Sequence, residues 1–199
     1  DNKATIAEEG GIKAIVTAMR QHKKSVAVQE KACGALWNLA YKDNNSIAIA
    51  KVGGIKAVVT AMRKHKNAVG VQEQACATLW NLSINGDNRI EEGGIKAAIA
   101  KEGGIEAVVL AMRQHEGLAA VQERACGALA NLACNSNANR IAIAKAGGIE
   151  AVVTAMRQHK GLVGVQEKAC AVLRNMTTSN SNANQIAIAE AGGIDAVVT

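Results

Sequence analysis

The chain has 199 residues, of which 49% are apolar, and its 23 Lys and Arg outnumber its 17 Asp and Glu to give a net charge of +6. This excess is a mild bias towards acidic partners and does not by itself single out nucleic acid. No apolar run approaches the roughly 20 residues that a membrane-spanning helix needs. The first residues, Asp1-Asn2-Lys3, do not have the pattern of a signal peptide.

The dominant feature of the sequence is a repeat. The triplet Val-Gln-Glu starts at Val28, Val71, Val121 and Val165, so successive copies lie 43, 50 and 44 residues apart. Each copy follows Gly-Gly-Ile and Ala-Met-Arg-x-His, and precedes Ala-Cys and an Asn. Periods of this size are typical of stacked arrays in which each unit buries its apolar face only against its neighbours. The sequence therefore predicts an elongated array rather than one globular core.

Each unit contains three helical signals. After the double glycine, Ile12, Ile15, Val16 and Met19 have the spacing of one apolar helix face, and the three later copies keep it. A second long helix is expected from about residue 26 to residue 40, with copies that follow the other Val-Gln-Glu triplets. Short helices are expected at 46–52, 140–146 and 185–191, after Asn-rich loops whose Asn and Ser suit helix N-caps. The Gly-Gly pair then ends each short helix with a turn.

This order of elements, the motif Gly-Gly-Ile-x-Ala-Val-Val and the stretch Ala-Cys-Gly-Ala-Leu-Trp-Asn-Leu-Ala at residues 32–40 resemble the armadillo repeat family over essentially the whole chain. The resemblance implies an all-α, right-handed superhelical solenoid of three-helix repeats, whose third helices line a concave groove. We expect one array with a partial repeat at 1–41, repeats at 42–84, 85–134 and 135–178, and a truncated repeat at 179–199. Because both end repeats are incomplete, we expect the chain to be a fragment of a longer array.

The 50-residue spacing contains an insertion, Glu91–Ala97, which repeats the sequence of Glu8–Ala14. Seven residues are almost two helical turns, so the insertion can lengthen the short helix without rotating its apolar face. Its two glycines each cost about 1 kcal/mol inside a helix, so a bulge is an equally good prediction. We favour a slipped duplication over a functional loop, because insertions are tolerated on surfaces.

The best candidates for a binding role are asparagines that recur at one position of the predicted third helix. They are Asn38, Asn81, Asn131 and Asn175. In armadillo proteins the matching Asn points into the groove and hydrogen-bonds the backbone of an extended peptide, and an amide suits this task because it both donates and accepts. The alternatives are a structural Asn that caps the helix end and simple inheritance by duplication.

Nuclear import receptors of the family place a Trp four residues before this Asn, where this chain has only Gly or Ala. Small residues there resemble the catenin-like branch more than importin-α, which implies recognition of acidic segments by basic groove residues. Further groove candidates are Lys31, Gln74, Arg124, Lys168 and Arg174. Trp37 and Trp80 precede the Asn, where they would either contact a ligand or fill gaps between repeats.

The cysteines and histidines are expected to be structural. Cys33, Cys76, Cys126 and Cys170 share one repeat position, and stacked helices are too far apart for disulfides, so we expect small apolar fillers in a reduced protein that is intracellular, cytoplasmic or nuclear. Cys134 is expected to be more exposed. Each repeat has one His at the end of its second helix, which suits the helix dipole and is too few for a metal site.

The sequence shows no catalytic motif, so we expect a binding protein without enzymatic activity, cofactor or metal. The leading hypothesis is a scaffold that binds an extended, acidic protein segment. One alternative is nucleic-acid binding through the Arg, His and Lys side chains at the ends of the second helices. Another is an engineered or duplicated array without a natural ligand, which would associate end to end through its truncated repeats.

Overall fold

The computed structural model describes residues 10–84, 94–178 and 182–193, and these residues form helices and no strand. The short helices are α4 (Asp43–Lys51), α7 (Gly94–Lys101), α10 (Asn137–Lys145) and α13 (Asn182–Glu190). The second helices are α2 (Gly11–Gln21), α5 (Gly54–Lys64), α8 (Gly104–Gln114) and α11 (Gly148–Gln158). The third helices are α3 (Val26–Leu39), α6 (Val69–Ile84), α9 (Ala119–Ala133) and α12 (Val163–Thr177).

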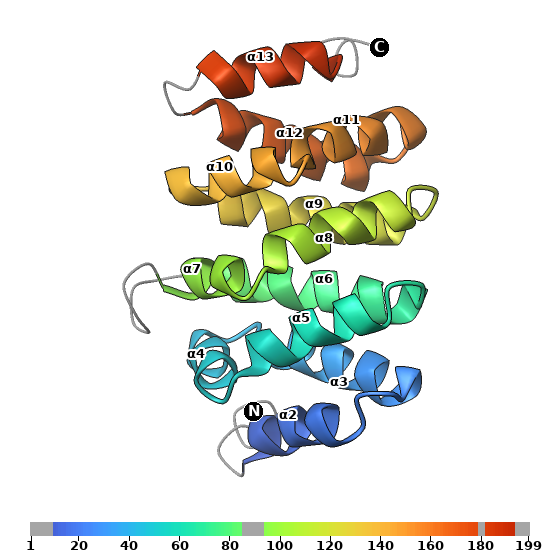
Figure 1. Ribbon diagram of the computed structural model, residues 1–199, viewed down its shortest axis with the longest axis vertical. Coiled ribbons are helices and arrows are strands. Elements are labelled where there is room, and N and C mark those ends of the chain that lie inside the picture. The colour runs from blue at the N-terminus through green and yellow to red at the C-terminus, as the bar shows by residue number, and fades with distance from the viewer. Residues whose placement is uncertain (1–9, 85–93, 179–181, 194–199) are drawn as a thin grey trace.

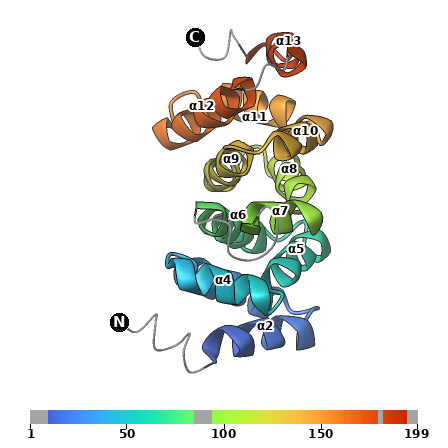
Figure 2. The same cartoon turned by 90° about the vertical axis from the view of Figure 1, so that its left-hand side faces the viewer.

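The helices stack along one long axis in chain order, from α2 at one end to α13 at the other (Figure 1). In the view of Figure 2, α6 and α9 lie in one column and α5 and α8 in another. Third helices contact one another more extensively than any other pair of helices. The all-α solenoid of three-helix repeats that the sequence predicts is therefore confirmed.

The core is one continuous row of aliphatic side chains that runs through the repeats. On α8, for example, Ile105, Val108, Val109 and Met112 are at most 1% exposed. The same four positions are buried on α5 and α11, whereas on α2 Ile15 is half-buried. The predicted period-3.6 face is therefore the core face, and each repeat completes the burial of the one before it.

The double glycine makes the corner between the short and the second helix, as predicted. At Gly103 the backbone has φ of 75°, a left-handed conformation that side chains rarely adopt. At Gly104 a Cβ would lie 2.5 Å from Cγ2 and 2.9 Å from the carbonyl oxygen of Ile99. The first glycine is thus needed for its conformation and the second for close packing against the short helix.

The short helices begin earlier than the sequence predicts, because their Asn residues lie inside the helix rather than in the preceding loop. Asn139 is buried on α10 and donates from Nδ2 to the carbonyl oxygen of Leu132, 2.9 Å away, at the end of α9. Asn45 and Asn184 make the matching bond to Leu39 and Met176. This asparagine, which we call the clamp Asn, ties the start of each of these short helices to the preceding third helix.

The insertion changes this clamp. Residues 91–93 lie outside the described residues, and Gly94–Ala97 form the first half of the described part of α7. The two predictions for the insertion, a longer short helix and a bulge, both concern residues before Gly94, which lie outside the described residues. Ile95, fully buried, takes the place of the clamp Asn.

We expect removal of Glu91–Ala97 to leave a folded array with a restored clamp. In the shortened chain Asn88 would lie six residues after Leu82, the separation between Leu39 and Asn45. Asn88→Ala should then reduce the free energy of unfolding of the shortened chain by about 1–3 kcal/mol, because a buried carbonyl loses its donor. Urea unfolding followed by circular dichroism measures both variants. An Asn139→Ala variant of the full chain is the control and should show a similar loss; a shortened chain without cooperative unfolding would contradict the prediction.

No single helix within 10–84, 94–178 and 182–193 is long and apolar enough to cross a membrane. Only α4 and α5 taken together reach the required length and hydropathy within these residues, and the two helices are bent by 73° relative to each other.

Candidate peptide-binding groove

The four asparagines predicted to contact a ligand lie in one row on the third helices, one per repeat. Three of them also connect neighbouring helices. Asn81 donates from Nδ2 to the carbonyl oxygen of Trp37 at 3.1 Å, and Asn175 donates to that of Ala130 at 2.8 Å. Asn131 makes the matching, longer bond to Trp80 at 3.5 Å.

Neither peptide contact nor helix capping, the two roles predicted for this Asn, includes a hydrogen bond between repeats. Each bond uses one N–H of the amide and leaves the second N–H and the carbonyl oxygen for another partner. Asn81, Asn131 and Asn175 are all half-buried, so their amides still reach the surface. Asn38 is exposed and makes no such bond within the described residues. The row of Asn therefore holds the third helices in register and presents amide groups along their outer face.

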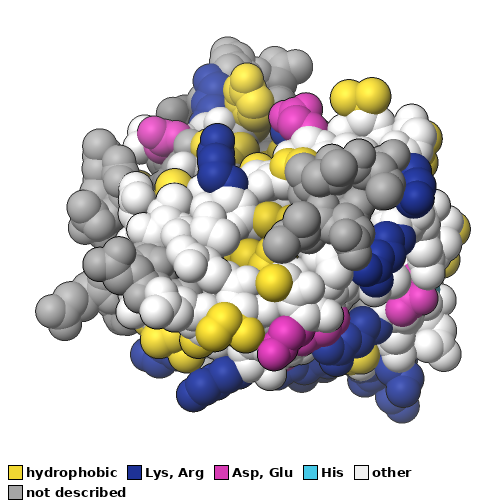
Figure 3. Space-filling model, turned by 90° about the horizontal axis from the view of Figure 1, so that it is seen from above, with side chains coloured by type: hydrophobic (Ala, Val, Ile, Leu, Met, Phe, Trp, Pro, Cys, Tyr) yellow, Lys and Arg dark blue, Asp and Glu magenta, His cyan; other side chains and the backbone are white. Residues whose placement is uncertain are grey.

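The predicted basic residues of this face have acidic neighbours. Lys31 pairs with Glu30 at 3.1 Å, and Lys168 pairs with Glu167 at 2.6 Å. Arg124 pairs through Nε with Glu73 of the preceding repeat at 3.2 Å. Figure 3, which looks down on one end of the array, shows Asp and Glu beside Lys and Arg there as well. The charge of this face is therefore largely compensated, and Gln74 is neutral.

Two of these cations cover the two tryptophans. The guanidinium of Arg124 lies 4.5 Å from the ring centroid of Trp37, and the ammonium of Lys168 lies 5.4 Å from that of Trp80. In each contact the cationic side chain reaches past the third helix that lies between, so side chains of alternate third helices meet on this face. Such cation–π contacts hold the rings and cations in one composite surface.

A hollow opens on this face where α6, α9 and α12 meet, with a volume of roughly 500 Å³. Its base is made of small residues, including Gly127, Ala130 and Ala171. Trp80 packs so closely on Gly127 that a Cβ there would lie 2.6 Å from the ring. The small Gly127, four positions before Asn131, thus makes room for Trp80 of the preceding repeat, which both fills a gap and lines the hollow.

The Arg and His side chains at the ends of the second helices connect repeats. His115 donates from its ring nitrogen to the carbonyl oxygen of Lys66 at 2.8 Å, and His65 and His159 make matching bonds. Arg113 donates to the carbonyl oxygen of Gly147 at 3.2 Å, in the Gly-Gly turn of the next repeat. The other Arg residues of this position make bonds of the same kind. These groups serve as ties between repeats, a role that the sequence analysis did not contain.

A buried glutamine is a further structural residue that the sequence analysis missed. Gln122 donates from Nε2 to the carbonyl oxygens of Met112 at 3.0 Å and His115 at 2.8 Å, which caps the end of α8. The same Gln of every Val-Gln-Glu triplet makes this pair of bonds. Its presence in all four triplets was a usable signal, because each helix end leaves carbonyls that need donors.

The aligned cysteines are not equivalent. Cys33, Cys76 and Cys126 are buried, and burial raises the pKa of each thiol to about 12. Cys170 is exposed, so the prediction of four buried fillers is wrong at this position; on α12 no further described third helix covers it. Cys134 is half-buried. Among the described residues, no group of three His, Cys, Asp or Glu is placed to hold a metal ion.

Comparisons with known proteins agree with this architecture. The family model described as "LRRK2 ARM repeat" matches residues 5–196. A crystal structure of an engineered protein from the Northeast Structural Genomics Consortium superposes with a TM-score of 0.81 at 27% identity, over 98% of this chain and 73% of that one. No curated protein matches the chain in sequence.

Two other solved structures resemble the chain in fold at 19% identity. One is a designed armadillo repeat protein in complex with the peptide (KR)4, with a TM-score of 0.80 over 98% of this chain and 75% of that one. The other comes from a study of the interaction between cadherin and beta-catenin, with a TM-score of 0.51 over 100% of this chain and 43% of that one. With the family model matched over nearly its whole length, the chain belongs to the armadillo repeat family.

Proposed function

We propose that the chain is a protein-interaction scaffold that binds an extended peptide segment along the face of its third helices. The observation that carries this proposal is the row of half-buried Asn amides, each with one N–H engaged between repeats and its second N–H and carbonyl oxygen left for another partner. Because each amide is fixed by its bond to the neighbouring helix, it can meet a peptide backbone without losing much side-chain entropy. The designed armadillo protein in complex with a peptide supports this mode of binding.

The acidic preference is a finer part of the proposal. The pairs formed by Lys31, Arg124 and Lys168 with Glu side chains weaken the pull of those cations on an acidic ligand. Arg174, exposed on α12, has no acidic partner within the described residues and lines the same hollow as Trp80. The other two charged residues of the hollow, Glu167 and Lys168, pair with each other. We therefore place the acidic anchor of the ligand at Arg174 and an apolar side chain of the ligand against Trp80.

Nucleic-acid binding through the ends of the second helices is the weaker candidate. Its His residues are engaged in bonds between repeats, and each Arg spends part of its guanidinium on such a bond, which leaves fewer donors for phosphates. Trp37 and Trp80 lie on the third helices rather than at the ends of the second helices, so they are not placed to stack the bases of a nucleic acid bound there.

Fluorescence anisotropy with a labelled peptide of alternating Glu and Leu tests the proposal. Asn38→Ala is the most informative substitution, because Asn38 makes none of the bonds between repeats seen at the other copies. We expect it to weaken binding by about 0.5–1.5 kcal/mol with unchanged stability. Arg174→Glu should weaken binding of this peptide and favour one in which Lys replaces Glu.

The double substitution Asn81→Ala with Asn131→Ala should abolish most binding, at some cost in stability from the lost bonds between repeats. Lys145→Glu, on an exposed position of α10 away from this face, is the matched control for Arg174→Glu. If neither Asn38→Ala nor the double variant changes the affinity, the third-helix face is not the binding site. If Arg174→Glu and Lys145→Glu act alike, binding is not anchored at Arg174.

A further inference from the structure

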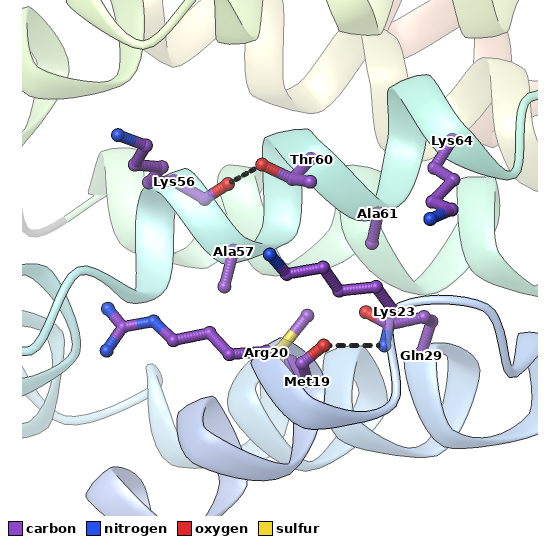
Figure 4. Close-up of a pocket in the computed structure, with 9 residues that line it drawn as sticks. All are labelled: Met19, Arg20, Lys23, Gln29, Lys56, Ala57, Thr60, Ala61 and Lys64. Atoms are coloured by element: carbon purple, nitrogen blue, oxygen red, sulfur yellow. Dashed lines mark hydrogen bonds between the residues drawn. The ribbon is translucent and has the colours of Figure 1, made fainter.

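A pocket on the second helices carries an unusual concentration of positive charge. It lies between α2 and α5, away from the third-helix face, and has a volume of about 210 Å³. Arg20 and Lys23 line it from the α2 side, and Lys56 and Lys64 line it from α5, with no acidic residue among the lining side chains (Figure 4). None of these four cations is paired with an acid within the described residues.

The shape of the pocket suits a small anion. Its floor is formed by the buried side chains of Met19, Ala57 and Ala61. In Figure 4 the ammonium of Lys23 lies between the two helices next to Ala57, the ammonium of Lys64 lies beside Ala61 at the other end, and Lys56 extends outwards. A water molecule takes about 30 Å³ of liquid, so the volume fits a compact anion and is too small for a folded segment.

Two of the cations are held in place by bonds between repeats. Arg20 donates from Nη2 to the carbonyl oxygen of Val52 at 2.6 Å, which leaves its other N–H groups for a ligand. The backbone of Lys23 accepts a bond from His65 at 2.8 Å. The neutral polar side chains of the lining have their donors engaged: the hydroxyl of Thr60 donates to the carbonyl oxygen of Lys56, and Nε2 of Gln29, on α3, donates to the carbonyl oxygens of Met19 and His22. Recognition therefore depends on the cations.

The other junctions of the array show that this charge is not a property of the repeat. Between α5 and α8 the matching positions hold Arg63 and Lys66, but Glu106 and Gln114 stand where α5 has its two lysines. Between α8 and α11 the matching positions are occupied by one cation, Arg113, and two acids, Glu116 and Glu150. There Gln158 donates to Glu116 at 3.1 Å across the junction. Only the first of these three junctions has four cations and no acid.

From this geometry we propose that the pocket between α2 and α5 binds a compact polyphosphate anion, either free or as the headgroup of a phosphorylated lipid. Several closely spaced negative charges match four cations better than a single carboxylate does, because each phosphate oxygen accepts charge-assisted hydrogen bonds. The site is separate from the third-helix face, so it does not depend on peptide binding.

Isothermal titration calorimetry with inorganic tripolyphosphate at an ionic strength of about 0.15 M tests the proposal. We expect one anion per chain. Lys56→Glu with Lys64→Gln gives the first junction the residues of the second and should weaken binding by about tenfold or more, since it removes one charge and reverses another. Adding Glu106→Lys and Gln114→Lys to that variant should restore binding at the second junction.

A charge-matched control separates a specific site from diffuse attraction. Lys101→Glu with Lys145→Gln changes the net charge by the same amount on exposed positions outside the pocket, and should bind as the parent does. Equal affinity of the parent and the pocket variant would overturn the proposal, as would an equal loss in the control. Phosphatidylcholine vesicles with and without phosphatidylinositol bisphosphate form a second arm: retention lost in the pocket variant assigns a lipid headgroup, and tripolyphosphate binding alone assigns a free anion. Circular dichroism verifies that each variant is folded.

Discussion

Gln122→Met is expected to reduce the free energy of unfolding by about 2–4 kcal/mol, among the largest effects of any polar substitution in the chain. The Gln122 side chain is 1% exposed and donates two hydrogen bonds to the last carbonyls of α8. Methionine has a similar volume, so the loss comes from the missing donors rather than from a cavity. His115 keeps a backbone bond to its carbonyl oxygen from Leu118, whereas Met112 loses the side-chain donor at the helix end.

Urea unfolding monitored by circular dichroism measures this effect. Gln114→Met, the same change at an exposed position on the preceding helix, should alter stability by less than about 0.5 kcal/mol. Gln166→Met removes the same pair of bonds at a half-buried site, where water can replace the donor. Its loss in free energy of unfolding should therefore lie between those of the Gln122 and Gln114 variants. Equal stability of the Gln122 and Gln114 variants would show that the cap is not needed. A broadened transition would show that the repeats have become less cooperative.

Stability is expected to fall steeply above pH 9 because of the three buried cysteines. Desolvation raises the pKa of Cys33, Cys76 and Cys126 from 9.0 to about 12. For Cys76 the neighbouring Cys33 adds to this shift and Arg124 opposes it; for Cys126 the neighbour that adds is Cys76. Between pH 9 and 12 the unfolded thiols lose protons that the folded thiols keep, so rising pH favours the unfolded state.

Each such thiol lowers the free energy of unfolding by up to about 1.4 kcal/mol per pH unit in this window. The expected result is a shallower fall in the triple variant Cys33→Ala, Cys76→Ala, Cys126→Ala than in the parent, measured by urea unfolding at several pH values. All other residues are shared by both proteins. The variant Cys134→Ala with Cys170→Ala, whose cysteines are half-buried or exposed, should keep the slope of the parent. Identical slopes in all three proteins would contradict the assignment.

Much of the fold is readable from the sequence because the repeat presents each pattern several times. The spacing of Ile105, Val108 and Met112 predicts a buried face, and the structure buries it. The Gly-Gly pair predicts a turn, and the left-handed backbone at Gly103 accounts for it. The starts of the short helices are harder to predict, because Asn139 has the character of a loop residue and its place inside the helix depends on its bond to Leu132.

The candidate site is harder to predict from the sequence than the fold, for a physical reason. In a solenoid, every junction needs the same contacts as the next, so a residue repeated for packing looks the same as one repeated for ligand binding. Asn131 recurs in part because its amide joins α9 to α6, and His115 because its ring joins two turns. Repetition alone does not separate these roles.

The sequence by itself determined the class of architecture, the helix faces and the turns, because these depend on local periodicity and on the conformational freedom of glycine. Only the tertiary structure decided which polar side chains join repeats, since partners such as Arg124 and Trp37 are far apart along the chain. It also decided where charge is compensated and where it gathers: Arg124 lies against Glu73 of the preceding repeat, whereas Lys23 and Lys64 line one pocket. Such juxtapositions depend on how the repeats stack, which no single repeat encodes.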